Sequence, residues 1–156
     1  NVQLASRIST INTNDESTSN RIRYYNHALN QVLETPFFGV GSGNWKFKSV
    51  YLDRFNINGY TVPYHVHNDF LEIFTELGVL GFTFYFVLFL LSFIYLFRSF
   101  NNSTSLEDLY VNMMFIVVLF SFFIDSNLNF PHARLIQISF FIIILAYSSI
   151  PLSYKK

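Results

Sequence analysis

Apolar and polar residues divide this chain into two parts. Residues 1–75 mix apolar positions with polar and charged ones, whereas residues 76–156 consist mainly of long apolar runs. The first of these runs, Gly78 to Phe97, has 20 residues and no charge. At about 1.5 Å per residue, a helix of this length spans roughly 30 Å, the thickness of the hydrocarbon layer of a bilayer. The alternative is a buried helix of a large soluble protein, but the length and the absence of charge favour a membrane span.

Two more apolar runs follow, at about residues 109–125 and 134–150. Together with the run at 78–97 they predict three transmembrane helices. The sequence therefore predicts an all-α polytopic membrane protein, in which an extramembrane loop with an amphipathic helix precedes three transmembrane helices. We assign the loop region to residues 1–75 and the transmembrane region to residues 76–156.

Basic residues predict the orientation of these helices, because cytoplasmic loops carry an excess of Lys and Arg. With three spans, the linker 98–109 and the C-terminus lie on one side and hold three basic residues, while the turn 125–134 on the other side holds one. The loop 1–75 is too long for the rule to apply. We therefore expect residues 1–75 and the turn to face the periplasm or the cell exterior, and the C-terminus to face the cytoplasm.

One helix is expected within the loop region. Residues 1–18 are rich in Ser, Thr and Asn and predict an irregular lead-in. An amphipathic helix is predicted over residues 20–33, with Ser19 or Asn20 as its N-cap and Pro36 as its end. Its apolar positions at helical spacing are Ile22, Tyr25, Leu29, Val32 and Leu33.

Composition narrows the possible functions. Charged residues make up 13% of the chain, aromatic residues 20%, and the formal net charge is zero. A neutral chain has no basic field that would attract nucleic acid, so we expect no nucleic-acid partner. The absence of cysteine excludes a disulfide framework and a thiolate metal site. Because the chain begins with Asn1 rather than methionine, we expect a fragment that lacks an N-terminal part.

The tract His67-Asn68-Asp69-Phe70-Leu71-Glu72 stands directly before the first apolar run. Asp69 and Glu72 have the spacing of a capping box, which predicts a helix that begins there and continues into the first span. His67 then lies just before a helix N-terminus, where the dipole disfavours imidazolium and favours a bound anion. A neutral histidine at this position can accept a proton from an attacking hydroxyl. The alternative is an ordinary surface histidine in a loop.

Two further motifs have plainer interpretations. His65-Val66-His67-Asn68-Asp69 matches an H-x-H-x-D metal-ligand pattern, but the remaining histidines are His27 and His132, and nothing else completes such a ligand set. We therefore predict neither a metal site nor a cofactor. Gly39-x-Gly41-x-Gly43 lacks the spacing and the flanking strand of a nucleotide-binding loop, and predicts a tight turn before Trp45. Residues 46–66 show no clear period, and we expect a loop there.

Arginines are the candidates for phosphate binding, because the guanidinium fork suits bidentate contacts. Arg21 and Arg23 open the predicted amphipathic helix, and their positions alone do not distinguish between them. Arg134 is a further candidate, in a polar cluster between the second and third spans. The alternative for each is a solvated or snorkelling side chain. The cluster also contains Asp125, Asn127, Asn129 and His132.

Three groups of residues, taken in order, resemble a known family. They are Ser19-Asn20-Arg21 with Tyr25 and Ala28-Leu29, then Pro36-Phe37-Phe38-Gly39-Val40-Gly41-Ser42-Gly43, and then His67-Asn68-Asp69-Phe70-Leu71-Glu72 with Glu76-Leu77-Gly78-Val79-Leu80-Gly81. Their order and spacing resemble the O-antigen ligase family, whose C-terminal region also occurs in O-antigen polymerases and bacterial protein O-oligosaccharyltransferases. The resemblance extends over roughly Ser19 to Leu145.

The resemblance implies a polytopic inner-membrane glycosyltransferase of lipopolysaccharide biosynthesis. Such an enzyme moves a glycan from undecaprenyl diphosphate to an acceptor hydroxyl without a metal ion or nucleotide sugar. By resemblance, Arg21 is the catalytic arginine at the diphosphate, and His67 activates the acceptor hydroxyl. The further candidates for substrate binding are Arg23, Asn68, Glu72 and Arg134.

The chain departs from the family pattern in two respects. Tyr25 stands where the family usually has tryptophan, a mild change for an interfacial aromatic side chain. A further basic residue used by these enzymes lies upstream of this chain. We therefore expect the fragment to be inactive alone.

The expected partners are an undecaprenyl-diphosphate-linked glycan, membrane lipid and an acceptor. The sequence leaves the acceptor open, because ligases use a lipid A-core sugar, polymerases a second repeat unit and oligosaccharyltransferases a protein hydroxyl. A rival from another class is a non-enzymatic transporter or binding protein for lipid-linked glycans. His67 distinguishes the classes, since a binding protein tolerates Asn or Gln there and a general base does not.

Overall fold

The computed structural model describes residues 16–57 and 62–149, and its regular elements in those ranges are all helical, as the sequence predicts. Within these two ranges, five α-helices and one 3₁₀ turn follow one another. They are α2 (Glu16–Glu34), α3 (Trp45–Leu52), α4 (Asp69–Asn101), α5 (Leu106–Leu128), η1 (Pro131–Ala133) and α6 (Leu135–Ser149).

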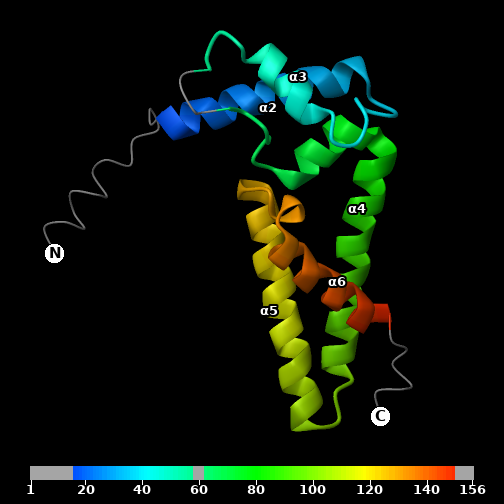
Figure 1. Cartoon of the computed structure of the whole chain (residues 1–156). Coiled ribbons are helices and arrows are strands. Elements are labelled where there is room, and N and C mark those ends of the chain that lie inside the picture. The colour runs from blue at the N-terminus through cyan, green and yellow to red at the C-terminus, as the bar shows by residue number, and fades with distance from the viewer. Residues whose placement is uncertain (1–15, 58–61, 150–156) are drawn as a thin grey trace, which may run out of the picture.

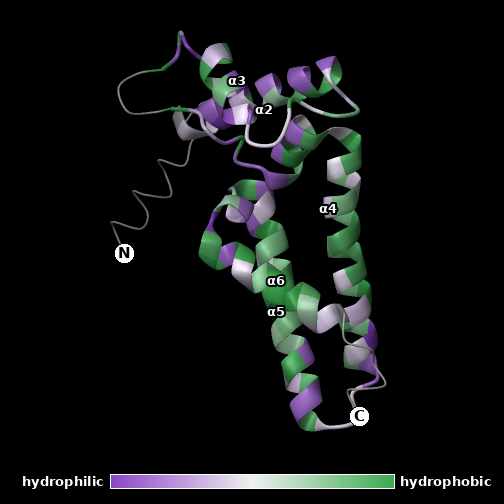
Figure 2. Cartoon of the chain, turned by 45° about the vertical axis from the view of Figure 1, so that its right-hand side comes forward, coloured by the Kyte–Doolittle hydropathy of each residue, from purple (hydrophilic) through white to green (hydrophobic). Residues whose placement is uncertain are grey.

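The helices form an upright antiparallel hairpin with a cap at one end (Figure 1). α4 and α5 run side by side, α6 packs across both, and α2 and α3 lie over the end at which α4 begins. The turn η1 between α5 and α6 packs at this same end, so the long loop region and the turn meet. The hairpin carries most of the apolar sequence, whereas polar residues concentrate in the cap (Figure 2).

In the part of the chain that the structure describes, two helices are long and apolar enough to cross a membrane. α4 has 33 residues and α5 has 23, and only 17% and 22% of their most apolar windows are buried within the protein. Exposed apolar helices of this length need lipid or other apolar helices around them. The described part of α6 has 15 residues, about 22 Å of helix, which is shorter than a bilayer's hydrocarbon layer. The structure thus supports two of the three predicted spans by length.

Aromatic rings form the centre of the hairpin. Phe89 of α4 stacks on Phe141 of α6, with ring centroids 4.6 Å apart. Phe122 of α5 also stacks on Phe141, at 4.9 Å. Leu96, Leu119 and Ile144 complete the buried cluster. Close aromatic packing of this kind holds the three helices together where the hydrophobic effect between helices is weak, as in a bilayer.

α4 is interrupted at Gly78, whose φ of 67° and ψ of −166° are not helical. The N–H of Val79 donates to the carbonyl of Pro36 at 2.8 Å, instead of to Thr75 four residues earlier. The carbonyl of Thr75 in turn accepts from Val40 at 2.9 Å. The chain between Pro36 and Val40 therefore docks on the helix break and fixes the loop region to α4. A Cβ on Gly78 would lie 2.2 Å from the carbonyl oxygen of Phe37, so only glycine fits.

Glu76 extends this docking to the glycine-rich turn. Its carbonyl accepts from Gly41 at 2.8 Å, and its carboxylate accepts from the N–H groups of Gly43 at 2.9 Å and Trp45 at 3.1 Å. The turn is therefore bound to α4, and Trp45 is buried at the start of α3. This arrangement agrees with the tight turn expected before Trp45.

The loop region departs from the prediction in three ways. α2 confirms the amphipathic helix but begins at Glu16, so the expected N-caps Ser19 and Asn20 lie inside it. Its buried residues are Tyr24, Ala28, Gln31 and Val32, while several of the predicted apolar positions are exposed. The buried face of α2 differs from the predicted one because α3 and the chain before α4 cover the side that carries Ala28. Ala28, Trp45 and Val66 form a buried cluster there. The loop expected over residues 46–66 is wrong in part, since α3 occupies its beginning.

The predicted capping box at the start of α4 is also wrong. The N-cap is Asn68, whose side-chain oxygen accepts from the N–H of Leu71 at 3.0 Å. An asparagine one residue earlier makes the capping bond that Asp69 was expected to make. The carboxylates of Asp69 and Glu72 therefore remain available for partners in other elements.

Candidate functional site

His67 lies between α2 and the α5–α6 turn, at the end of the helical hairpin that the cap covers. Its ring stacks against Tyr24 with centroids 6.3 Å apart and meets the edge of Phe130 at 5.1 Å. Its carbonyl accepts a hydrogen bond of 3.1 Å from the hydroxyl of Tyr25. Its φ of 63° falls in the left-handed region, which non-glycine residues rarely adopt. Such local strain is kept where surrounding contacts enforce it, often at a functional site.

The surroundings of His67 favour the neutral imidazole. The Nδ1 atom is buried and has no hydrogen-bond partner among the described residues, so an imidazolium would leave a buried N–H donor unpaired. Burial lowers the pKa of His67, and the positive charges of Arg21 and Arg134 act in the same direction, against an opposing effect of Glu72. A neutral imidazole can accept a proton near neutral pH.

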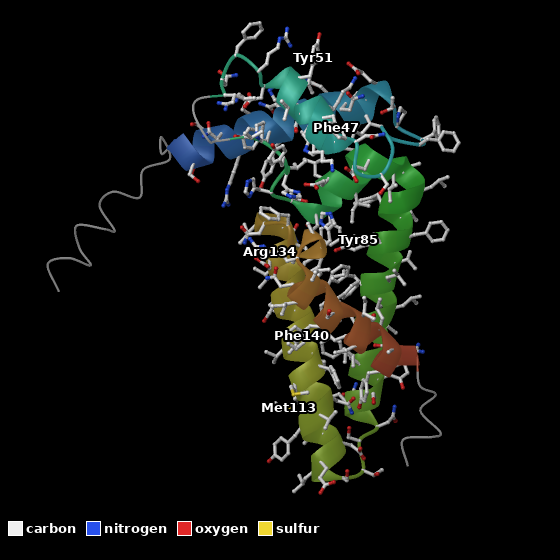
Figure 3. The ribbon with its side chains drawn as sticks, viewed as in Figure 1. Phe47, Tyr51, Tyr85, Met113, Arg134 and Phe140 are labelled. Carbon is white, nitrogen blue, oxygen red and sulfur yellow. The ribbon has the colours of Figure 1, made fainter. Side chains whose placement is uncertain are left out.

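Two arginines from different elements act electrostatically on His67. Arg21 lies on α2, and Arg134 follows η1, with its guanidinium carbon 4.6 Å from the centroid of Phe130. Arg134 is exposed and lies where the α5–α6 turn faces the α2 side (Figure 3). Arg21 and Arg134 thus both act electrostatically on His67, although up to 113 residues separate the three in the chain.

Arg23 occupies a different position from Arg21. Its Nε lies 2.6 Å from Oδ1 of Asp53, and a second guanidinium nitrogen lies 3.1 Å from Oδ2. Although burial would raise the pKa of Asp53, the hydrogen bonds from Arg23 and Asn56 outweigh that effect and hold the pKa below its usual range. This bidentate pair joins α2 to the end of α3, and the guanidinium of Arg23 is already bound to a carboxylate of the protein.

Asn68 and Glu72 also have partners within the protein. The amide nitrogen of Asn68 donates to the carbonyl of Asn127 at 3.3 Å, while its oxygen caps α4. Glu72 is 4% exposed; its carboxylate accepts from the N–H of Val66 at 2.8 Å and lies 2.9 Å from Nδ1 of His65. These contacts hold the chain around His67 in place.

His65 and His67 do not point together as a metal pair. His65 lies against Glu72 and stacks flat on Phe130 with centroids 4.2 Å apart, whereas His67 meets the edge of the same ring. Over residues 16–57 and 62–149, no group of three or more His, Cys, Asp or Glu side chains is arranged to hold a metal ion.

Sequence reasoning missed three residues of this site. Tyr24 and Phe130 contact the ring of His67 on two sides. Asp53 pairs with Arg23, which gives Arg23 a different role from Arg21. The i, i+4 relationship of Tyr24 to Ala28 on the buried side of α2 is a signal that could have identified Tyr24. Nothing in the local sequence predicts the pairing of Asp53 with Arg23, 30 positions away, or the contact of Phe130 with His67, 63 positions away.

Comparison with known proteins gives one match. Residues 2–86, more than half of the chain, match a family model described as O-antigen ligase. The matched range contains both Arg21 and His67 and ends within α4. No curated protein and no solved structure shows a significant match.

Proposed function

Because this chain belongs to the O-antigen ligase family, we propose that it acts as a membrane glycosyltransferase of the ligase type. The donor is a glycan linked to undecaprenyl diphosphate, and the acceptor is a hydroxyl group. The site carrying His67 faces the periplasmic side of the bacterial inner membrane, and the C-terminus faces the cytoplasm. Members of this family are ligases or related polymerases and oligosaccharyltransferases, and this donor chemistry is common to all three.

The observation that carries the proposal is the environment of His67. His67 is half-buried, its Nδ1 has no hydrogen-bond partner among the described residues, and its lowered pKa reflects burial and the charges of two arginines from separate elements. A proton acceptor next to two cations suits a reaction in which a hydroxyl is deprotonated and a diphosphate leaves.

The reaction is one displacement at the anomeric carbon of the donor sugar. His67 accepts the proton of the acceptor hydroxyl while its oxygen forms the new glycosidic bond. The bond between the anomeric carbon and the diphosphate oxygen breaks, and undecaprenyl diphosphate leaves with the electron pair. Arg21 and Arg134 neutralise the charge that builds on the diphosphate. His67 then releases its proton to solvent.

The contacts of the remaining candidates support positioning roles. Arg23 is paired with Asp53, Asn68 caps α4, and Glu72 holds His65 and the N–H of Val66. We therefore assign binding of the diphosphate to Arg21 and Arg134, and assign these three residues to the support of the loop.

The test uses the intact protein in purified membranes, with a lipid-linked glycan and an acceptor. Release of undecaprenyl diphosphate and transfer of glycan are measured for wild type, His67→Ala and His67→Gln. We expect transfer to fall on the order of 10²- to 10⁴-fold in both variants, the usual size of a general-base effect. His27→Gln is the matched control, because His27 also lies on the cap but contacts Asp53 rather than the site.

The same experiment addresses the rival classes. Variants at His67 that transfer as fast as wild type would remove the general base from the proposal. Binding of the lipid-linked glycan without any release would favour a transporter or binding protein. Release that is lost on addition of EDTA would favour a metal-dependent reaction through the H-x-H-x-D residues.

A further inference from the structure

His132 lies outside the proposed chemistry, yet both of its charged partners, Asp69 and Glu72, are buried carboxylates. The Nδ1 atom of His132 and its backbone N–H both contact the carboxylate of Asp69, the latter at 3.0 Å. Asp69 is completely buried. Two contacts between the same pair of residues, 63 positions apart, bind the α5–α6 turn to the first residue of α4.

The second ring nitrogen of His132 faces another carboxylate. Its Nε2 lies 3.8 Å from Oε1 of Glu72, and this oxygen is also 2.9 Å from Nδ1 of His65. A neutral imidazole carries only one N–H, so it would direct an unprotonated nitrogen at one of the two carboxylates. An imidazolium presents an N–H to both.

The charges around the ring of His132 also favour the imidazolium. In the described residues no Lys or Arg lies within ion-pair distance of Asp69 or Glu72. Their ion-pair contacts come from histidines: His132 contacts both carboxylates, and His65 contacts Glu72. Burial alone would lower the pKa of His132, but the hydrogen bond and charge of Asp69, with the charges of Glu72 and Glu76, raise it. Other titratable or charged groups near the turn are Arg134, on its own segment, and His65, which contacts Glu72. Asp125 accepts from Asn129 and Gln137, and the hydroxyl of Tyr85 donates to Asp69 at 3.4 Å.

The turn that His132 holds carries two residues of the proposed site. Phe130, two residues earlier, lies between the rings of His65 and His67, at 4.2 and 5.1 Å. Arg134, two residues later, has its guanidinium over the ring of Phe130, 4.6 Å from the centroid. Movement of the turn would therefore displace one wall of the His67 site and one of its two arginines together.

We propose that His132 is a positioning residue: as an imidazolium between Asp69 and Glu72, it fixes the α5–α6 turn and thereby holds Phe130 and Arg134 against His67. This inference rests on the proposed function only in naming the ligand of Arg134, a lipid-linked diphosphate. Asp69 shares the role, because it receives both contacts from His132.

The test measures binding of undecaprenyl diphosphate to the intact protein in nanodiscs, with His132→Gln, Arg134→Ala and the double variant. If His132 acts through Arg134, each single variant weakens binding on the order of tenfold, the size of one charge-assisted hydrogen bond, and the double variant is no weaker than Arg134→Ala. A double variant whose loss is the product of the two single losses overturns the proposal. His27→Gln is the matched control, since His27 also contacts a buried aspartate, and we expect its affinity to stay within about twofold of wild type.

A second measurement does not depend on a His132 variant that folds. Affinity is followed from pH 6 to 9 for wild type and Arg134→Ala, so that titration of the diphosphate itself is common to both. We expect wild type to bind more tightly than Arg134→Ala at low pH, and this difference in affinity to shrink as the pH rises and His132 is deprotonated. A constant ratio across this range overturns the proposal.

Failure of this inference can be distinguished from failure of the proposed function. Coupling between His132 and Arg134 in binding, with transfer unaffected in His67→Ala, supports the positioning role and contradicts the general base. Loss of transfer in His67→Ala, without that coupling, supports the base and overturns the positioning role.

Discussion

The side chain of Arg23 is paired with Asp53, with Nε and Oδ1 2.6 Å apart, and this pair makes two arginines of α2 different from one another. Arg21, two positions earlier on the same helix, acts electrostatically on His67. One arginine joins α2 to α3, and the other is the arginine of α2 that we propose for substrate binding.

The two arginines should therefore respond differently to substitution. Arg23→Ala leaves the carboxylate of Asp53, which is almost fully buried, without its partner, and we expect a loss of about 3 kcal/mol in the free energy of unfolding. Arg21→Ala should leave stability within about 0.5 kcal/mol and lower transfer on the order of 10²-fold. Thermal unfolding and glycan transfer, measured on both variants, test the difference. Arg54→Ala is the control, since that guanidinium lies over the exposed rings of Tyr51 and Phe55. Equal effects of Arg21 and Arg23 on transfer, with no effect on stability, would contradict the assignment.

Glycine at position 39 should be required for docking of the loop region on α4. Gly39 has a φ of 65°, and a Cβ there would lie 2.4 Å from the backbone of Glu76. Gly39→Ala therefore adds a clash with backbone to the cost of a positive φ, which alone is about 1 kcal/mol. Gly43→Ala is the matched control, because Gly43 has a φ of 73° but nothing within 4 Å of the added atom. We expect Gly39→Ala to lower the unfolding temperature clearly more than Gly43→Ala, and similar effects would argue against the docking.

The carboxylate of Glu76 should stabilise the glycine-rich turn and the start of α3. Glu76→Ala removes the acceptors of two backbone N–H groups, those of Gly43 and Trp45. We expect a loss of about 2 kcal/mol in the free energy of unfolding, from two charge-assisted hydrogen bonds in a partly exposed position. Glu34→Ala, at the exposed end of α2, serves as the comparison. Hydrogen exchange at residues 43 and 45 reports the change directly, and unchanged protection would contradict it.

The two histidines His67 and His132 should give opposite dependences on pH. The pKa of His67 is lowered in the folded protein, so its contribution to stability is complete above about 6.5 and is lost as the pH falls through the folded pKa. The pKa of His132 is raised, so its contribution is complete below about 6.5 and is lost as the pH rises through the folded pKa.

Transfer should therefore show a plateau with two limbs. On the acid side, activity persists below pH 6.5, because His67 stays neutral there. On the alkaline side, activity falls as His132 loses its proton and the turn is released. The pH dependence of transfer in wild type and His132→Gln tests this, and we expect the variant to lose the alkaline limb. An alkaline limb that is identical in both proteins would assign it to another group.

The sequence alone determined the elements whose signals are local. Long uncharged runs predicted α4 and α5, and helical spacing predicted α2, because length, charge and period are properties of neighbouring residues. The resemblance to the O-antigen ligase family is confirmed over residues 2–86, and it rests on short motifs that stand close together in the chain. Through that resemblance the motifs also indicated His67 and Arg21, though not why Arg23 differs.

Tertiary structure decided everything that depends on distant partners. Asp53 distinguishes the two arginines from a position 30 residues away, and Asp69 binds His132 from 63 residues away. The backbone of residues 36–41 interleaves with α4 at the break in Gly78, which makes a glycine motif into a docking contact. These pairings form because buried charges and free backbone groups need partners, and the packing decides which partners are near. The spacing of neighbouring residues in the sequence does not specify those partners.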